Sequence, residues 1–378
     1  MTILVTLLGG ALLLELLLEL TERVTGSWRN QQPRPHYPWS FCSTAGRWLT
    51  SERGSLRLSV YPMSLYRNLP SQQTEWFRIN SSGFRGPELK AASASRRRVI
   101  LLGGSTVFGT GLDDDTQTIA AYLESLLDNA EVVNAGVIGF QSGQELAYYV
   151  KDLIDLRADT VIALNGWNDF SQILHTSGKG GQVLPPRLMG FNWFTNMERA
   201  LVDYSAIRYG SLLRRLALLG PLLFPRLWST ASHLTSAVAR RTFRPEDRSL
   251  EGFQRWIAGF EHDGPQADYF NAVVDSYANN TTVLRDIAAS RSTRFLCVMQ
   301  SPRTTDPAAG LYRSFTKAVM DRLATSGVHA INLCDDPDRP CDALFLDSIH
   351  LDQSGCREVA SLIASRLTQT AQGNALGN

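Results

Sequence analysis

Short apolar runs alternate with helix-like stretches along the chain from residue 97 onward. The first run, Val99–Leu102, ends in Gly-Gly, which is typical of a buried central strand. Further apolar runs predict strands at Glu131–Asn134, Thr160–Leu164, Thr293–Met299 and His329–Leu333. Apolar residues at helical spacing predict helices at Thr116–Leu127, Gln144–Leu156, Tyr269–Ser290, Ser314–Ser326 and Gln353–Leu367. Strands that alternate with helices in this way imply right-handed crossovers and a parallel, doubly wound α/β sheet.

Two regions break this rhythm. Residues 26–95 are rich in Pro, Ser, Arg and aromatic residues and show little periodicity, so we expect an irregular arm or a small β-rich prelude. Residues 171–265 include the stretch LLRRLALLGPLLFPRLW (212–228), whose two prolines exclude one straight helix. We interpret this region as a helical insertion that forms a lid or a membrane-facing surface; a second membrane span is the less favoured alternative. The main domain is then expected over residues 96–372.

The N-terminal segment is more apolar than the rest of the chain. Residues 3–20 are nearly all apolar, with Glu15 and Glu19 as the interruptions, and have about the length of a membrane span. The segment has no basic n-region and no Ala-x-Ala cleavage site, so residues 1–25 predict an uncleaved membrane anchor rather than a cleaved signal peptide. A buried amphipathic helix is the alternative.

The orientation of such an anchor stays open. Arg23, Arg29 and Arg34 follow it, which by the positive-inside rule would keep the rest of the chain in the cytoplasm, but long domains are often translocated regardless of nearby charge. Cys334 and Cys341 bracket a short Asp/Pro loop and could close it as a disulfide in an oxidising compartment.

Composition excludes some partners. The chain has 44% hydrophobic residues, 19% charged residues and a formal net charge of +1, an ordinary balance for a globular protein. There is no basic excess to favour nucleic acid, and we interpret the run Arg96–Arg98 as a solvated surface. No Cys/His array has the spacing of a zinc site, so no metal is expected.

Polar clusters follow the first three predicted strands, where open α/β sheets bind ligands. The serine of Gly103–Thr106 can present its hydroxyl at a helix start, although this is also ordinary turn chemistry. The glycines of Asn134–Gly139 allow a close backbone approach or form a plain turn. An Asn amide within Asn165–Asp169 can donate to a developing oxyanion, or stabilise an Asx-rich turn.

A fourth cluster follows the last predicted strand. His350 is suited to proton transfer near neutral pH, and Asp347, three residues earlier, can accept its second ring N–H and fix the tautomer. His175 has no comparable partner in the sequence and is interpreted as a surface or packing residue.

The order Ser, Gly, Asn, Asp-x-x-His at successive strand ends resembles the SGNH (GDSL-type) hydrolase superfamily over about residues 96–367. This resemblance implies a three-layer, flavodoxin-like fold. The usual Gly-Asp-Ser-Leu opening is Gly-Gly-Ser-Thr here, and the missing Asp is not one of the acting groups. The phrase RINSSGFRG (78–86) and Gln300-Ser301-Pro302 look like features of bacterial membrane-anchored or exported members.

The resemblance also implies residue roles. Ser105 matches the nucleophile, His350 its base and Asp347 the group that orients the base. The oxyanion hole would consist of the N–H groups of Ser105 and Gly139 and the side-chain amide of Asn168.

Together these features predict a serine hydrolase of carboxylic esters, O-acyl groups on carbohydrate among them, that needs no metal or organic cofactor. An O-acyltransferase with the same triad and a non-catalytic carbohydrate- or partner-binding module are the alternatives. The expected partners are a small-molecule or glycan ester and a membrane contacted through residues 3–20, with no nucleic acid. We expect the catalytic domain in the periplasm or outside, anchored to a bacterial inner membrane. The sequence leaves the oligomeric state open.

Overall fold

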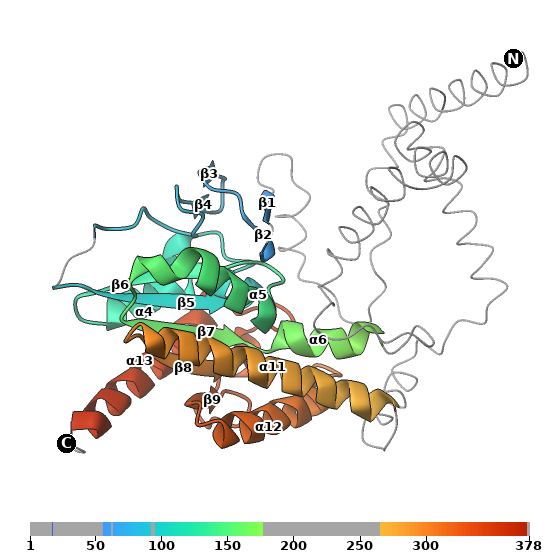
Figure 1. Cartoon of the computed structure of the whole chain (residues 1–378). Helices are drawn as coiled ribbons and strands as arrows, with labels where there is room; N and C mark the ends of the chain where they lie inside the picture. The colour runs from blue at the N-terminus through green and yellow to red at the C-terminus, as the bar shows by residue number, and fades with distance from the viewer. Residues whose placement is uncertain (1–16, 18–55, 62, 92–94, 177–264, 376–378) are drawn as a thin grey trace, which may run out of the picture. The chain divides into compact units, whose positions relative to one another are not determined.

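The computed structural model describes residues 17, 56–61, 63–91, 95–176 and 265–375 (Figure 1). The chain divides into two compact units, Met1–Pro38 with Asn192–Phe253 and Trp39–Phe191 with Gln254–Asn378. All described residues except Leu17 belong to the second unit. The predicted anchor at 3–20 and the stretch 212–228 lie outside the described residues, so both stay predictions. Among the described helices, none is both long and apolar enough to cross a membrane.

A five-stranded parallel sheet forms the centre of the second unit. Its strands are β5 (Arg97–Gly103), β6 (Ala130–Gly136), β7 (Thr160–Asn165), β8 (Arg294–Met299) and β9 (Ala330–Asn332). They lie in the order β6-β5-β7-β8-β9, and every neighbouring pair is parallel. Numbered along the chain this order is 2-1-3-4-5, the flavodoxin-like strand order. The predicted fold class is therefore confirmed.

Helices cover both faces of this sheet (Figure 1). The helices of the described chain that flank it are α4 (Ile119–Leu126), α5 (Ser142–Tyr148), α6 (Trp167–Thr176), α11 (Pro265–Ser290), α12 (Ala309–Thr325) and α13 (Gln353–Ala375). Helices α4 and α13 pack together, whereas α11 packs against α5, α6 and α12. Side chains of one strand alternate between these two groups. Leu296 belongs to the cluster with α4 and α13, and the next residue, Cys297, contacts Tyr277 of α11.

The boundaries of the predicted helices differ from those in the structure, and two differences are informative. The stretch predicted as one helix, Gln144–Leu156, is α5 followed by a π-helical turn at Tyr149–Leu153 and a 3₁₀ turn at Ile154–Leu156. Tyr148, the last residue of α5, and Tyr149, the first residue of the π turn, are both buried. Helix α12 begins at Ala309, before the predicted Ser314, because Leu311 and Tyr312 already pack into the core.

The predicted arm contains short strands that reach the main sheet. Strands β1 (Leu58–Tyr61) and β2 (Leu65–Asn68) form an antiparallel hairpin, and β3 (Gln72–Gln73) pairs with β4 (Arg78–Ile79). Arg85 then forms an antiparallel bridge with Asn134 of β6. Part of the predicted arm is thus joined to the edge strand of the main sheet.

The disulfide left open by the spacing of Cys334 and Cys341 is not formed. The four cysteines of the described chain are free thiols. Cys334 is buried, with its Sγ 3.7 Å from the carbonyl of Gln300, whereas Cys341 is exposed at the start of the 3₁₀ turn Asp342–Leu344.

Candidate active site

Three predicted site residues form one continuous chain of hydrogen bonds. Ser105 is the first residue of the short helix α3 (Ser105–Phe108), immediately beyond the end of β5. Its Oγ lies 2.8 Å from Nε2 of His350, and Nδ1 of His350 lies 2.7 Å from Oδ2 of Asp347. The side chains of His350 and Asp347 are each 7% exposed. These distances are those of a nucleophile, a base and a group that orients the base.

The two oxygens of Asp347 have separate partners. Oδ1 accepts hydrogen bonds from the backbone N–H groups of Ile349 (2.9 Å) and His350 (2.8 Å), which shapes the loop, while Oδ2 faces the imidazole ring. Burial favours the neutral acid, but the electrostatic interaction with the His350 ring and the hydrogen bonds from His350 and Ile349 outweigh burial and hold the pKa of Asp347 well below its usual range. An ionised Asp347 accepts the proton of Nδ1, so Nε2 is left to accept one from Ser105.

The loop after β6 and the start of α6 meet beside Ser105. Gly139 has φ of +80°, a left-handed conformation that favours glycine. The side-chain amide of Asn168 donates to the carbonyl of Phe140 at 2.8 Å. An amide nitrogen carries two hydrogens, so within the described part of the chain one remains for a ligand. The N–H of Ser105 lies in the first helical turn, where no intrahelical acceptor exists.

The position of Asn168 depends on a neighbouring residue with no side chain. A Cβ placed on Gly104 would lie 2.4 Å from Nδ2 of Asn168, far inside van der Waals contact. The amide therefore packs directly against the backbone that precedes Ser105. From the sequence Gly104 is predicted only as part of a turn, because its close approach to Asn168 joins two segments far apart along the chain.

Replacing Gly104 by Ala is expected to displace the Asn168 amide and to lower kcat for ester hydrolysis by roughly 10²- to 10³-fold, the usual effect of losing one oxyanion donor. Steady-state kinetics on a p-nitrophenyl ester measure this effect. Gly310→Ala is the matched control, because a Cβ there has nothing within 4 Å. Equal kcat values for the two variants would show that Asn168 is not held in place by Gly104.

A buried carboxylate that sequence analysis missed links the two loops. Asp169 accepts from Oγ of Ser142 at 2.6 Å and from its backbone N–H at 3.0 Å, at the start of α5. Nε2 of Gln141 donates to the carbonyl of Asn168 at 3.2 Å. These bonds tie the segment that follows Gly139 to the first turn of α6. The Asn-Asp pair at 168–169 was the available signal, but only its Asn was assigned.

A second buried acid lies next to Asp169. Asn165 donates to Glu145 and accepts from the hydroxyl of Tyr277, so three elements share one buried polar network. Burial, reinforced by the negative charge of Asp169, raises the pKa of Glu145 well above its usual value. Burial also raises the pKa of Asp169 to about 6, although the hydrogen bonds from Ser142 act in the opposite direction and lower it.

This raised pKa has a consequence for stability. Between about pH 4 and pH 6 the folded protein keeps a proton on Asp169 that the unfolded chain releases, so the free energy of unfolding falls as pH rises through that window. At ~1.4 kcal/mol per pKa unit the loss is about 3 kcal/mol. We expect Asp169→Asn, which has no proton to release there, to remove this loss in urea unfolding from pH 4 to pH 6. Asp155→Asn, at an exposed position, is the control, and an unchanged slope in Asp169→Asn would contradict the assignment.

The arm contacts the loop that carries Gly139. The hydroxyl of Tyr66 donates to the carbonyl of Ile138 at 2.7 Å, and Nδ2 of Asn68 donates to the carbonyl of Gly136 at 3.0 Å. Nε2 of Gln144 donates to the carbonyl of Ser64 at 3.0 Å. The left-handed turn at Gly139 is thus held between the arm and α6. Among the described residues, no three His, Cys, Asp or Glu side chains gather as metal ligands.

Comparison with known proteins gives structural matches. A GDSL-like lipase from Bacteroides thetaiotaomicron is 11% identical, over 75% of this chain and 93% of that one, with a TM-score of 0.38. A lipase/acylhydrolase from Enterococcus faecalis is 12% identical, over 72% and 96%, with a TM-score of 0.38. An acetyl xylan esterase is 12% identical, over 71% and 98%, with a TM-score of 0.39.

No protein-family model and no curated protein matches the sequence. The strand order of this chain shows its fold class, and the contact between Ser105 and His350 marks the candidate active site.

Proposed function

We propose that the protein is a serine hydrolase of carboxylic esters, with Ser105 as nucleophile, His350 as general base and Asp347 as the group that orients His350. The observation that carries the proposal is the pair of short contacts at His350, 2.8 Å to Ser105 and 2.7 Å to Asp347. A non-catalytic binding module has no need for a buried carboxylate–imidazole pair aligned on a serine hydroxyl.

In the first step Nε2 of His350 takes the Ser105 proton as Oγ attacks the ester carbonyl carbon. The resulting imidazolium is stabilised by the ionised Asp347. The tetrahedral intermediate then collapses, His350 returns the proton to the departing alcohol, and an acyl group stays on Oγ. Water, deprotonated by His350, attacks this acyl-enzyme, and the acid leaves as Ser105 regains its proton.

The negative charge on the carbonyl oxygen needs donors fixed before the reaction. The backbone N–H groups of Ser105 and Gly139 and the side-chain amide of Asn168 are our candidates for this oxyanion hole. Support comes from the contacts that fix two of these donors: the loop of Gly139 is bonded to Tyr66, and Asn168 packs on Gly104 and donates to the carbonyl of Phe140. Preorganised donors of this kind act without reorganisation during the reaction.

The proposal covers carboxylic esters as a class, with O-acyl groups of carbohydrate included. The test is a panel of p-nitrophenyl esters from acetate to long acyl chains together with acetylated sugars, assayed with the purified full-length chain. Turnover of at least one ester is expected. Adding a sugar alcohol as acceptor separates hydrolysis from acyl transfer, since free acid is the product of the first and a new ester of the second. No turnover of any ester would overturn the proposal.

A further inference from the structure

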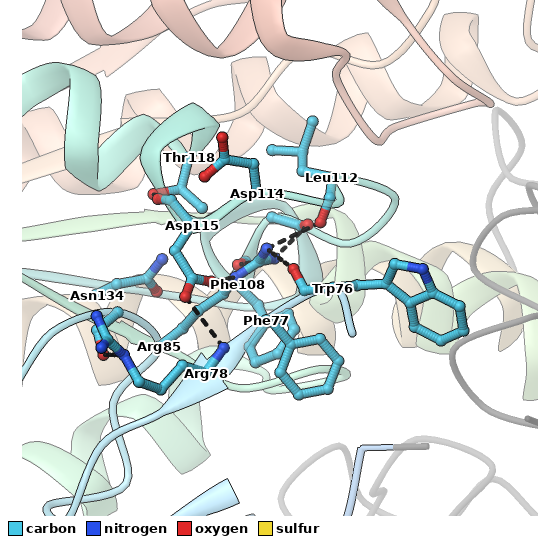
Figure 2. A network of polar contacts seen from close by, with 12 residues as sticks. Trp76, Phe77, Arg78, Arg85, Phe108, Leu112, Asp114, Asp115, Thr118 and Asn134 are labelled. Atoms are coloured by element: carbon cyan, nitrogen blue, oxygen red, sulfur yellow. Dashed lines mark hydrogen bonds and ion pairs between the residues drawn. The ribbon is translucent and has the colours of Figure 1, made fainter. Parts of the chain in front are cut away.

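A buried arginine from the arm contacts the helix that begins with Ser105. The side chain of Arg85 is 0% exposed, and its guanidinium lies over the rings of Phe77 and Phe108 (Figure 2). Nε donates to Oδ1 of Asp115 at 2.8 Å, which pairs the charge. The same carboxylate accepts from the backbone N–H of Arg78 through Oδ2 at 3.0 Å. The two aromatic rings and the Asp115 carboxylate, itself bonded to the Arg78 backbone, therefore fix the orientation of the Arg85 guanidinium.

The other nitrogens of Arg85 bind backbone carbonyls at the end of α3. Nη1 donates to the carbonyls of Phe108 (3.1 Å) and Gly109 (2.7 Å), and Nη2 donates to that of Leu112 (2.8 Å). A longer contact of 3.4 Å joins Nη2 to the carbonyl of Trp76 in the arm (Figure 2). One guanidinium thus spans the last residue of α3, the turn that follows it and the arm.

A one-turn helix needs such partners more than a long one does. Its last carbonyls have no N–H of a following turn to accept from, so they must bond elsewhere when buried. In α3, Asn134 of β6 donates to the carbonyl of Val107 at 2.9 Å and Arg85 takes the next two carbonyls. A cation at this end also complements the helix dipole. Ser105 lies one turn from these bonds, at the other end of the same helix.

We infer that Arg85 is a positioning residue for the proposed nucleophile: it fixes the C-terminal end of α3 and thereby the placement of Oγ of Ser105 relative to His350. The inference rests on the proposed role of Ser105. Residues 78–86, which the sequence assigns to the arm, would then contribute to the geometry of the proposed active site. Arg85 touches neither Ser105 nor His350 in any bond described above, so its effect passes through the α3 backbone.

The chain offers a matched control. Arg98, at the opposite end of β5 from Ser105, donates to Glu131 at 2.9 Å and to the carbonyls of Leu156 (3.1 Å) and Lys90 (2.8 Å). It too joins a carboxylate, the main domain and the arm, and its side chain is 13% exposed. Losing Arg98 removes one carboxylate bond and two carbonyl bonds but leaves α3 untouched.

The test compares Arg85→Ala, Arg85→Lys and Arg98→Ala in the full chain by kcat, KM and melting temperature. For Arg85→Ala we expect kcat to fall about 10- to 100-fold with KM within about twofold, since a displacement of the nucleophile on the order of 1 Å costs up to about 10²-fold. Arg85→Lys is expected in between, because an ammonium keeps the charge but cannot span the carboxylate and four carbonyls. For Arg98→Ala we expect a lower melting temperature with kcat within about twofold of wild type.

Hydrogen exchange adds a readout that does not depend on activity. In Arg85→Lys, backbone amides of residues 105–112 are expected to exchange faster, and those of 130–136 to keep their wild-type rates. Asp115→Asn, whose side chain is 20% exposed, is the milder variant if the Arg85 variants fail to fold, and it is expected to lower kcat several-fold. If the wild-type protein hydrolyses no ester, the proposed function is rejected, but hydrogen exchange still shows whether Arg85 fixes the backbone of residues 105–112. An active wild type with unchanged kcat in the Arg85 variants, or in Asp115→Asn where only that variant folds, would overturn the inference.

Discussion

Replacing Ser105 by Ala is expected to lower kcat for hydrolysis of a p-nitrophenyl ester by roughly 10⁴- to 10⁶-fold, close to the background reaction. The substitution deletes Oγ, the atom 2.8 Å from Nε2 of His350, and with it any covalent acyl-enzyme. The backbone N–H of residue 105 stays, so oxyanion donors and substrate binding are retained. Stopped assays at high enzyme concentration measure the residual rate.

The control for this variant is structural. Ser105→Ala is expected to keep the circular dichroism spectrum and the cooperative unfolding transition of wild type, because the removed hydroxyl bonds only to His350 among the described residues. A kcat within tenfold of wild type in a folded Ser105→Ala protein would show that Ser105 is not the nucleophile.

The second large effect is expected for Asp347→Asn, with kcat lower by about 10⁴-fold. The Asn oxygen can still accept from the N–H groups of Ile349 and His350, as Oδ1 does now, so the loop is kept. Its NH₂ group would then face Nδ1 of His350 and donate to it. That reverses the tautomer, puts the proton on Nε2 and leaves no acceptor for the Ser105 proton.

This prediction separates orientation from folding. Asp347→Asn is expected to melt close to wild type, whereas Asp347→Ala loses the loop bonds as well and is expected to melt lower. NMR of the imidazole nitrogens reports the tautomer directly. A proton still on Nδ1 in Asp347→Asn, or kcat within tenfold of wild type, would contradict the role assigned to Asp347.

Much of the fold followed from periodicity. The five predicted apolar runs correspond to the five strands, because a strand that is buried on both faces needs apolar residues at nearly every position. In β7, for example, all six residues are buried. The order of site residues along the chain also indicated which strand ends meet. Ser105 and His350, 245 positions apart, are within hydrogen-bond distance because the segments that follow β5 and β9 lie at the same edge of the parallel sheet.

The supporting residues were harder to predict because their signals are not periodic. Asp169 and Arg85 are charged side chains that a sequence reader places on the surface, and only the tertiary structure provides the carbonyls and N–H groups that allow their burial. The closeness of Gly104 to Asn168 likewise depends on two distant segments. The π turn at Tyr149–Leu153 has no local signature in the sequence.

Covalent labelling shows whether the serine at position 105 is a nucleophile. The full-length protein is incubated with a fluorophosphonate and digested, and the adduct is located by tandem mass spectrometry. We expect one stoichiometric adduct on Ser105 that forms in wild type, forms much more slowly in Asp347→Asn and is absent in Ser105→Ala. An adduct on another residue, or no adduct in a protein that still hydrolyses esters, would contradict this role of Ser105.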